Sequence, residues 1–323
     1  MKSYSEICQP IEAALAHVKE KVWQELGQVN DFAPEIGAYL QKMQGKYFRP
    51  TVVLLCAQML GQDTAKSIIL AQSVELLHLA TLIHDDVLDN AKVRRNLETI
   101  HEKWGNRVAI LVGDYLYSKT TQLLLQFQNF KILDHIASVT VGFTKGELLQ
   151  LFNQKQVSVS KSDYFKVIEL KTANFMAACA AFGGVLAAQH QEKLYQFGYH
   201  LGMAFQISDD LLDWVGNPGE AVKPVQHDLL NGIISLPLLL ALEEASSDEQ
   251  KTLQAYMDSQ NSALVSFAEK IIAQHHGVLK TQKILDEHLA KAAQALKDLP
   301  AYQPLQNLLE YLSERVVQIP IPK

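Results

Sequence analysis

Two short stretches of the chain carry aspartates in the same pattern, DDxxD. They lie at residues 85–89 and 209–213. On an α-helix, side chains four positions apart share one face about one turn apart, so Asp85 pairs with Asp89 and Asp209 with Asp213. Carboxylates this close repel each other unless a cation joins them. The spacing therefore predicts two acidic faces that bind cations.

The sequence around both clusters is apolar, LATLIHDDVL (79–88) and MAFQISDDLLDWV (203–215). Carboxylate oxygens in such surroundings suit Mg²⁺, which keeps water and shares its shell with substrate phosphates. Two such helices facing each other would hold a diphosphate through bridging magnesium ions. A single copy of DDxxD would more simply be a capped or exposed acidic helix end, but two copies with identical spacing favour a metal site.

A diphosphate site also needs direct positive charge, and arginine suits bidentate phosphate contact. The candidates near the acidic clusters are Lys46, Arg49, His78, Arg94, Arg95, Lys171 and Lys223. His78 lies two turns before the first cluster, on the same face. Three of them have a simpler interpretation: His78 as a hydrogen-bonded core residue, and Arg94 and Arg95 as a solvated helix end. Lys171 and Lys223 are weak signals when taken alone.

Helical periodicity dominates the rest of the chain. Apolar residues recur at helical spacing, and the stretches expected to form helices are 65–90, 108–128, 193–215 and 235–245. Ser235 is expected to cap the last of these, with Pro237 in its first turn. Only 16 glycines and 10 prolines are present, and no linker or repeat interrupts the pattern. The prediction is an all-α fold, with residues 1–323 forming one large helical domain of roughly ten or more helices.

Composition excludes several function classes. The formal charge of −6 provides no general field for nucleic acid. Cys8, Cys56 and Cys179 are scattered, without the spacing of a zinc site or disulfide framework. The N-terminal residues lack a signal-peptide core, and no run approaches eighteen uninterrupted apolar residues. We therefore expect a cytoplasmic protein without a transmembrane segment.

Several segments, in order, resemble the trans-isoprenyl diphosphate synthase family, in its long-chain polyprenyl branch. They are GKYFRP, ELLHLATLIHDD, DDVLDNAKVRR, WGNRVAILVGDYL, LKTANF, FQISDDLLD and KPVQHDLLNGIISLP. The similarity is dense from Gly45 to Pro237, and the two aspartate motifs are specific as a pair. It implies an all-helical bundle around a deep central cavity, usually a homodimer, acting on isopentenyl diphosphate and an allylic diphosphate.

The resemblance also implies a role for each matching residue. Magnesium on the allylic diphosphate would be bound by Asp85, Asp89 and Asp209, with Asp86 and Asp213 just behind them. The allylic diphosphate itself would be contacted by Arg94, Lys171 and Lys223. Isopentenyl diphosphate would be held by Lys46, Arg49, His78 and Arg95. Thr172 and Gln206 would lie near the developing carbocation, and Arg315 matches a C-terminal family arginine more weakly.

Three residues depart from the family pattern. Tyr47 stands where a basic residue is usual, His101 where asparagine is usual, and Gln226 where glycine is usual. Tyr47 and Gln226 leave open a weakened site or an unusual partner, but no expected metal ligand is lost.

Ala80 and Thr81 lie about one turn before Asp85, where bulky aromatic residues in the family give short products. Their small size predicts growth to a medium- or long-chain product, with a floor formed further down, by Leu77 or the 116–127 helix. A short-chain farnesyl or geranylgeranyl diphosphate synthase stays open, as does membrane contact during release of a long lipid.

Three other functions compete with this interpretation. A terpene cyclase would share the first DDxxD but usually has Asn and Ser ligands in its second metal motif. A non-catalytic subunit of a heteromeric prenyl synthase would typically lack aspartates that this chain keeps. A metal phosphohydrolase using His84 and Asp85 would need further matched ligands, which the sequence does not offer.

Overall fold

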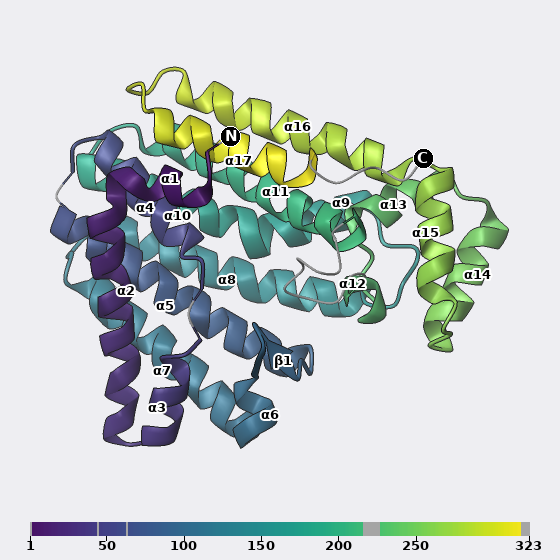
Figure 1. Cartoon of the computed structure of the whole chain (residues 1–323), viewed down its shortest axis with the longest axis horizontal. Helices are drawn as coiled ribbons and strands as arrows, with labels where there is room; N and C mark the ends of the chain where they lie inside the picture. The colour runs from purple at the N-terminus through teal and green to yellow at the C-terminus, as the bar shows by residue number, and fades with distance from the viewer. Residues whose placement is uncertain (1, 44, 63, 216–226, 318–323) are drawn as a thin grey trace.

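Apolar residues at helical spacing fold most of the chain into α-helices (Figure 1). The computed structural model describes all residues except 1, 44, 63, 216–226 and 318–323. The α-helices are α1 (Tyr4–Cys8), α2 (Glu12–Gly27), α3 (Pro34–Leu40), α4 (Phe48–Met59), α5 (Thr64–Leu88), α6 (Ile100–Trp104), α7 (Asn106–Leu125), α8 (Phe130–Asn153), α9 (Lys161–Ile168), α10 (Asn174–Ala187), α11 (Gln191–Val215), α12 (His227–Leu230), α13 (Leu236–Leu242), α14 (Ser247–Asp258), α15 (Leu264–Gln274), α16 (Gly277–Leu296) and α17 (Gln303–Val317).

Short irregular elements complete the fold. Two 3₁₀ turns cover Gln9–Ile11 and Gln28–Asp31, and a π-helical turn, Glu169–Ala173, joins α9 to α10. The strands β1 (Val93–Arg94) and β2 (Leu97–Glu98) form a two-stranded antiparallel hairpin directly after α5. The predicted all-α class is confirmed, because this hairpin is the only sheet within the described part of the chain.

The predicted helix ranges agree closely with α5, α7 and α11. The range 235–245 was too long, since α13 ends at Leu242. Gly61 and Gly105 both have positive φ, at 64° and 85°. Such a conformation is easily adopted by glycine, which has no Cβ to clash with the backbone.

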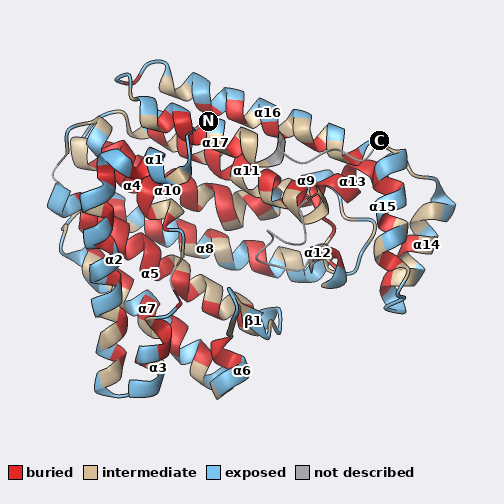
Figure 2. Cartoon of the chain, in the orientation of Figure 1, coloured by how far each residue is buried: buried red, intermediate tan, exposed pale blue. Residues whose placement is uncertain are grey.

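The central helices are the most deeply buried part of the molecule (Figure 2). All eleven residues from Phe175 to Val185 in α10 are buried, and α10 packs along α11, α4 and α8. The outer helices α2, α14, α15 and α16 each combine buried and exposed residues, which is the pattern expected for helices that cover an apolar layer (Figure 2).

Two helices, α5 and the continuous stretch Lys161–Ala187, are long and apolar enough to cross a bilayer by length and composition alone. In each, 72% of the apolar window is buried inside the fold. This burial is what the central helices of a helical bundle require, so the apolar character of both helices is accounted for by packing.

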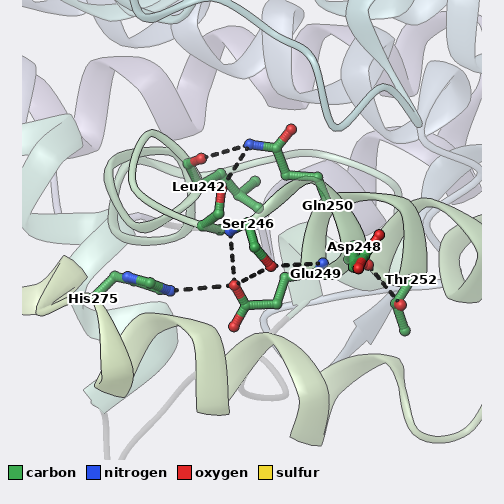
Figure 3. A network of polar contacts seen from close by, with 8 residues as sticks. Leu242, Ser246, Asp248, Glu249, Gln250, Thr252 and His275 are labelled. Atoms are coloured by element: carbon green, nitrogen blue, oxygen red, sulfur yellow. Dashed lines mark hydrogen bonds and ion pairs between the residues drawn. The ribbon is translucent and has the colours of Figure 1, made fainter.

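A polar network holds the peripheral helices α14 and α15 together (Figure 3). Ser246 and Glu249 form a capping box at the start of α14, with Ser246 N donating to Glu249 at 2.8 Å. His275, just beyond α15, lies 3.6 Å from the same carboxylate. Gln250 donates to the carbonyl of Leu242 at 2.9 Å, so α14 is also tied to the end of α13.

Close contact between α10 and α11 depends on glycine. A Cβ added at Gly198 would lie 2.5 Å from the Met176 carbonyl oxygen and 2.7 Å from the Ala180 Cβ. Backbone atoms of a buried helix cannot shift cheaply. Gly142 on α8 differs, since its Cβ would meet Leu170 at an ordinary 3.6 Å.

We therefore expect Gly198→Ala to lower the free energy of unfolding by about 1–3 kcal/mol through overpacking. The matched control Gly142→Ala should be neutral or gain up to about 1 kcal/mol, because alanine is the better helix former. Urea unfolding at one fixed protein concentration measures both changes. Equal effects of the two substitutions would contradict the assigned close contact.

Candidate active site

The two acidic clusters lie at the C-terminal ends of α5 and α11. Asp85 is half-buried, and Asp89 is exposed directly after the last residue of α5. Asp85 and Asp209 both act electrostatically on the guanidinium of Arg49, raising its pKa against the larger lowering effect of burial. Both carboxylates therefore lie near enough to Arg49 to act on its charge.

Asp85 has the properties of a ligand for a hard cation. Its Oδ1 is buried and has no hydrogen-bond partner. Burial raises the pKa of Asp85 to about 8, neighbouring Glu147 raises it further, and Lys171 opposes the shift. A divalent cation would satisfy the orphaned oxygen and offset the repulsion between these carboxylates, so the donor set fits magnesium.

The described residues contain no group of three or more His, Cys, Asp or Glu side chains arranged as a ready-made metal cage. This openness suits Mg²⁺, which is usually bound by one or two carboxylates together with water and phosphates. Carboxylates of the site are instead paired with cations of the chain. Arg94 Nε lies 2.6 Å from Asp86 Oδ1, and Arg315 lies 2.8 Å from Asp209 Oδ1.

Arg94 is placed by the hairpin that follows α5. Asp86 is buried, and burial raises the pKa of its carboxyl while the charge of Arg94 lowers it. The ion pair joins β1 to the last turn of α5. Asp86 thus holds Arg94, which is predicted to contact the allylic diphosphate, next to the aspartates predicted to bind the metal.

Asp210, the middle residue of the second cluster, is a hydrogen-bond acceptor for three elements. It accepts from the Tyr164 hydroxyl at 2.7 Å, from the Leu236 backbone N–H at 2.9 Å and from Gln206 at 3.2 Å. Burial raises its pKa to about 7, although these hydrogen bonds lower it. Asp210 therefore caps α13 and joins it to α9 and α11.

Ser235 occupies the predicted N-cap position of α13, and Pro237 lies in its first turn, but the Ser235 hydroxyl makes no capping bond. It accepts instead from the Trp214 indole N–H at 2.7 Å. Asp210, 26 residues away along the chain, supplies the cap oxygen, which local sequence could not indicate.

Lys171 and Thr172 lie in the π-helical turn between α9 and α10. Such turns are uncommon and often occur at functional sites. Lys171 forms an ion pair with the buried carboxylate of Glu147 and donates to Gln150 at 3.1 Å, both on α8. Thr172 donates to Gln206 at 3.0 Å. Thr172, Gln206 and Asp210 thus form one hydrogen-bonded chain from the π-helical turn to α13.

Of the residues predicted to hold isopentenyl diphosphate, Arg49 lies at the start of α4, His78 on α5 and Arg95 between β1 and β2. Arg49 donates to His78 Nε2 at 3.1 Å. Burial and the positive charge of Arg49 hold the pKa of His78 well below its usual value, so the imidazole is neutral and accepts. Arg95 lies against Gly45, where a Cβ would come within 2.8 Å of its Nη1, and Lys46 is exposed nearby in the chain.

Comparison with known proteins identifies the family. Residues 31–274 match the family model described as Polyprenyl synthetase. The chain belongs to the polyprenyl synthetase family. The predicted membership of the trans-prenyl diphosphate synthase family, and with it a prenyltransferase, is confirmed.

Relatives in this family cover nearly the whole chain. The octaprenyl diphosphate synthase of Haemophilus influenzae is 32% identical over 97% of this chain and 97% of its own length. Heptaprenyl diphosphate synthase component 2 of Geobacillus stearothermophilus is 31% identical over 97% of this chain and 98% of its own. These names agree with the resemblance to the long-chain branch.

Solved structures agree with the fold. A decaprenyl diphosphate synthase from Rhodobacter capsulatus superposes with a TM-score of 0.89 at 28% identity, covering 99% of this chain and 100% of that one. A polyprenyl synthase from Caulobacter crescentus, complexed with calcium and isoprenyl diphosphate, has a TM-score of 0.88 at 30% identity, covering 98% and 97%.

In this polyprenyl synthetase, the structure joins some predicted site residues and leaves others apart. It connects Arg94 with Asp86, Arg49 with His78, Thr172 with Gln206, and Arg315 with Asp209. Lys223 and Gln226 lie outside the described residues. His101, another departure from the family pattern, is buried and bonded to Thr99 at 3.0 Å.

Sequence reasoning missed four residues of the site: Glu75, Glu147, Gln150 and Tyr164. Glu75 had a usable signal, since it lies three residues before His78 and shares its helix face. Tyr164 on α9 and Glu147 and Gln150 on α8 belong to no recognisable sequence motif. Their contacts form only when these helices pack against α11 and the π-helical turn.

Replacing Tyr164 by phenylalanine removes one hydrogen bond from a buried carboxylate. We expect Tyr164→Phe to lower the free energy of unfolding by about 1–3 kcal/mol, the cost of leaving a buried polar group less satisfied. Tyr256→Phe, on the peripheral helix α14, is the control and should change it by less than about 0.5 kcal/mol. Equal unfolding midpoints for Tyr164→Phe and wild type would show that this bond does not hold α9 to α11.

Proposed function

We propose that this polyprenyl synthetase condenses isopentenyl diphosphate head to tail onto an allylic diphosphate primer. The product would be a medium- or long-chain all-trans polyprenyl diphosphate, and diphosphate would be released. The observation that carries this proposal is the pair of DDxxD motifs at the ends of α5 and α11, since an aspartate of each motif acts on the charge of Arg49. The octaprenyl, heptaprenyl and decaprenyl synthases among the relatives support the longer product.

Magnesium is the proposed metal, held by Asp85, Asp89 and Asp209 with Asp86 and Asp213 just behind. When bound, it would stabilise the negative charge that develops on the diphosphate as the allylic bond breaks. The buried, unpartnered Oδ1 of Asp85 supports this assignment. The calcium reported with the Caulobacter crescentus enzyme supports a divalent ion in the family.

Chain residues would orient the two substrates. Arg94, Lys171 and Lys223 are proposed to bind the allylic diphosphate, and Lys46, Arg49, His78 and Arg95 to bind isopentenyl diphosphate. Fixed donors aimed at a developing negative charge lower the barrier, and holding both substrates in register supplies further rate.

Thr172 and Gln206 are proposed to lie beside the developing carbocation, with Lys171 adjacent. The bond between Thr172 and Gln206 leaves the threonine oxygen lone pairs available to face positive charge. No described side chain is bonded so as to act as the base for the last proton, and the departing diphosphate is proposed to take it.

Product length is proposed to depend on the small residues one turn before the first motif. Ala80 is buried, with 2% of its surface exposed. The Thr81 hydroxyl donates to the His78 carbonyl at 2.8 Å and is thus turned back onto its own helix. Neither side chain forms an obstacle comparable to an aromatic ring, which supports chain growth past this level.

A homodimer is proposed from the outer surface of α7 and α8. These neighbouring helices expose large apolar side chains: Ile110, Leu111, Tyr117, Leu125, Phe130, Val141, Leu148, Leu151 and Phe152. An exposed apolar surface of this kind is typical of a subunit interface.

One apolar core includes residues from Ile7 to Leu312, which supports the proposal that residues 1–323 act as one domain.

A heteromeric enzyme is the second candidate, because one relative is named as component 2 of a heptaprenyl diphosphate synthase. The retained aspartates favour a catalytic chain in either case.

A cytoplasmic location is proposed as well, since Cys8, Cys56 and Cys179 are free and buried, as suits a reducing compartment.

The first test is a product assay on the purified protein with Mg²⁺, labelled isopentenyl diphosphate and a short allylic primer. We expect a ladder ending at one long species, with Asp85→Ala reducing the rate at least about 10³-fold through loss of transition-state charge stabilisation. Asp286→Ala, on the exposed face of α16, is the control and should retain activity.

Each other outcome has a definite meaning. A single short product would keep the enzyme class and contradict the interpretation of Ala80 and Thr81. No incorporation by the protein alone, followed by activity after adding a partner chain, would favour the heteromeric alternative.

The dimer proposal is tested by sedimentation. We expect a dimer for the wild-type protein, and Leu111→Glu should raise its dissociation constant by roughly tenfold or more, because a buried leucine contributes about 1.5–3 kcal/mol. Leu279→Glu places the same charge on an exposed leucine of α16 and should leave the dimer intact. A wild-type protein that sediments as a monomer at micromolar concentration would contradict the proposal.

A further inference from the structure

Glu75 is a buried acid on α5 that neither the metal site nor the diphosphate contacts have used so far. Only 7% of its surface is exposed. Its Oε2 is buried without a hydrogen-bond partner. An acid in this situation costs free energy when ionised, so its presence calls for a specific reason.

The carboxylate borders the cations proposed for isopentenyl diphosphate. One small cavity of about 10 Å³ is lined by Tyr47, Glu75, His78 and Arg95, together with apolar side chains. A space of this size holds about one water molecule. Arg49 donates to His78 on this side of α5, and its own Nε is buried without a partner.

Charge around Glu75 is almost entirely positive. Burial raises its pKa to about 7, while Arg49 and Arg95 lower it. In return, Glu75 raises the pKa of both arginines. The carboxyl is therefore balanced between burial, which favours the neutral form, and two cations, which favour the charged form.

The other groups that face Glu75 are neutral near pH 7. Burial lowers the pKa of His78, and burial raises the pKa of the Tyr4, Tyr47 and Cys179 side chains. Helix α2 contributes apolar side chains to the cavity, and its Lys19 lies 5.6 Å from the Tyr47 ring. Helix α7 reaches this part of α5 through the neutral Thr120, which donates to the Ser73 carbonyl.

We propose that Glu75 is a positioning residue that balances Arg49 and Arg95 in the free enzyme and takes up a proton when isopentenyl diphosphate binds. The inference rests on the proposed function, because it uses the substrate assigned to those cations. The incoming diphosphate replaces the carboxylate as the partner of the arginines. The carboxyl oxygen then accepts one proton from solvent, so that no buried negative charge opposes the ligand.

The sign of the pH dependence follows from this competition. Bound diphosphate raises the pKa of Glu75, so binding is strongest where the carboxyl is already protonated, below about pH 7. Affinity falls as pH rises through the free and then the bound pKa. Each unit of difference between the two corresponds to about a tenfold change in affinity.

Titration calorimetry of isopentenyl diphosphate tests the proposal on the full-length protein without turnover. Measurements at pH 7 in buffers of different ionisation enthalpy give the number of protons taken up on binding. We expect wild type to take up roughly half a proton more than Glu75→Gln, because Glu75 is about half-protonated there. The titration of the ligand itself is common to both proteins and cancels.

The affinity should follow the same pattern. From pH 6 to 8.5, the wild-type dissociation constant should rise up to about tenfold more than that of Glu75→Gln. Glu102→Gln, an exposed acid on α6, is the matched control and should behave as wild type. Equal proton uptake and equal pH dependence in wild type and Glu75→Gln would overturn the proposal, as would a uniform loss of affinity at every pH.

A second variant keeps the test decisive if Glu75→Gln does not fold. Arg95 is exposed, so Arg95→Gln should fold, and losing this cation should move the midpoint of the pH dependence upward. An unmoved midpoint would overturn the role of Glu75. Absence of isopentenyl diphosphate binding in wild type would instead contradict the proposed function, so the two failures are distinguishable.

Discussion

Repulsion between carboxylates at the ends of α5 and α11 is the constraint on which the site depends. Acidic side chains at a helix C-terminus also oppose the helix dipole, so this arrangement is doubly unfavourable. Cations from separate segments offset this repulsion: Arg94 of the hairpin pairs with Asp86, and Arg315 of α17 pairs with Asp209. Lys171 of the π-helical turn pairs with Glu147 and lowers the pKa of Asp85. Each holds a carboxylate in place, and a divalent ion with a diphosphate would take over the same charges.

The second acidic cluster combines two tasks in three aspartates. Asp209 faces Arg315, whereas Asp210 points to a different neighbour and caps α13. The hydrogen bond from Tyr164 to Asp210 joins α9 to α11, the helix that carries the proposed metal ligand Asp209, and the bond from Gln206 holds the same carboxylate in place. Rigid support of this kind matters, because a metal-binding face displaced by a fraction of an ångström loses its geometry.

The side that would receive isopentenyl diphosphate follows a different principle from the metal side. There the cations are in excess, the imidazole of His78 is neutral, and one buried acid lies among them. The two halves of the site thus attract the same chemical group by opposite means, carboxylates with metal on one side and direct cations on the other. Where members of the two sets are buried, as Asp86 and Glu75 are, their charge interactions are stronger than at the surface.

The sequence by itself determined the helical class, the limits of α5, α7 and α11, and the pairing of aspartates on single helix faces, because these depend on periods of three and four residues. The sequence also indicated the family, through several family-like segments that follow one another in the expected order. Only the tertiary structure decided that Arg315 meets Asp209, 106 residues away, that Lys171 meets Glu147, and that Asp210 rather than Ser235 caps α13. Those contacts join helices distant in sequence, and no local pattern specifies how such helices pack.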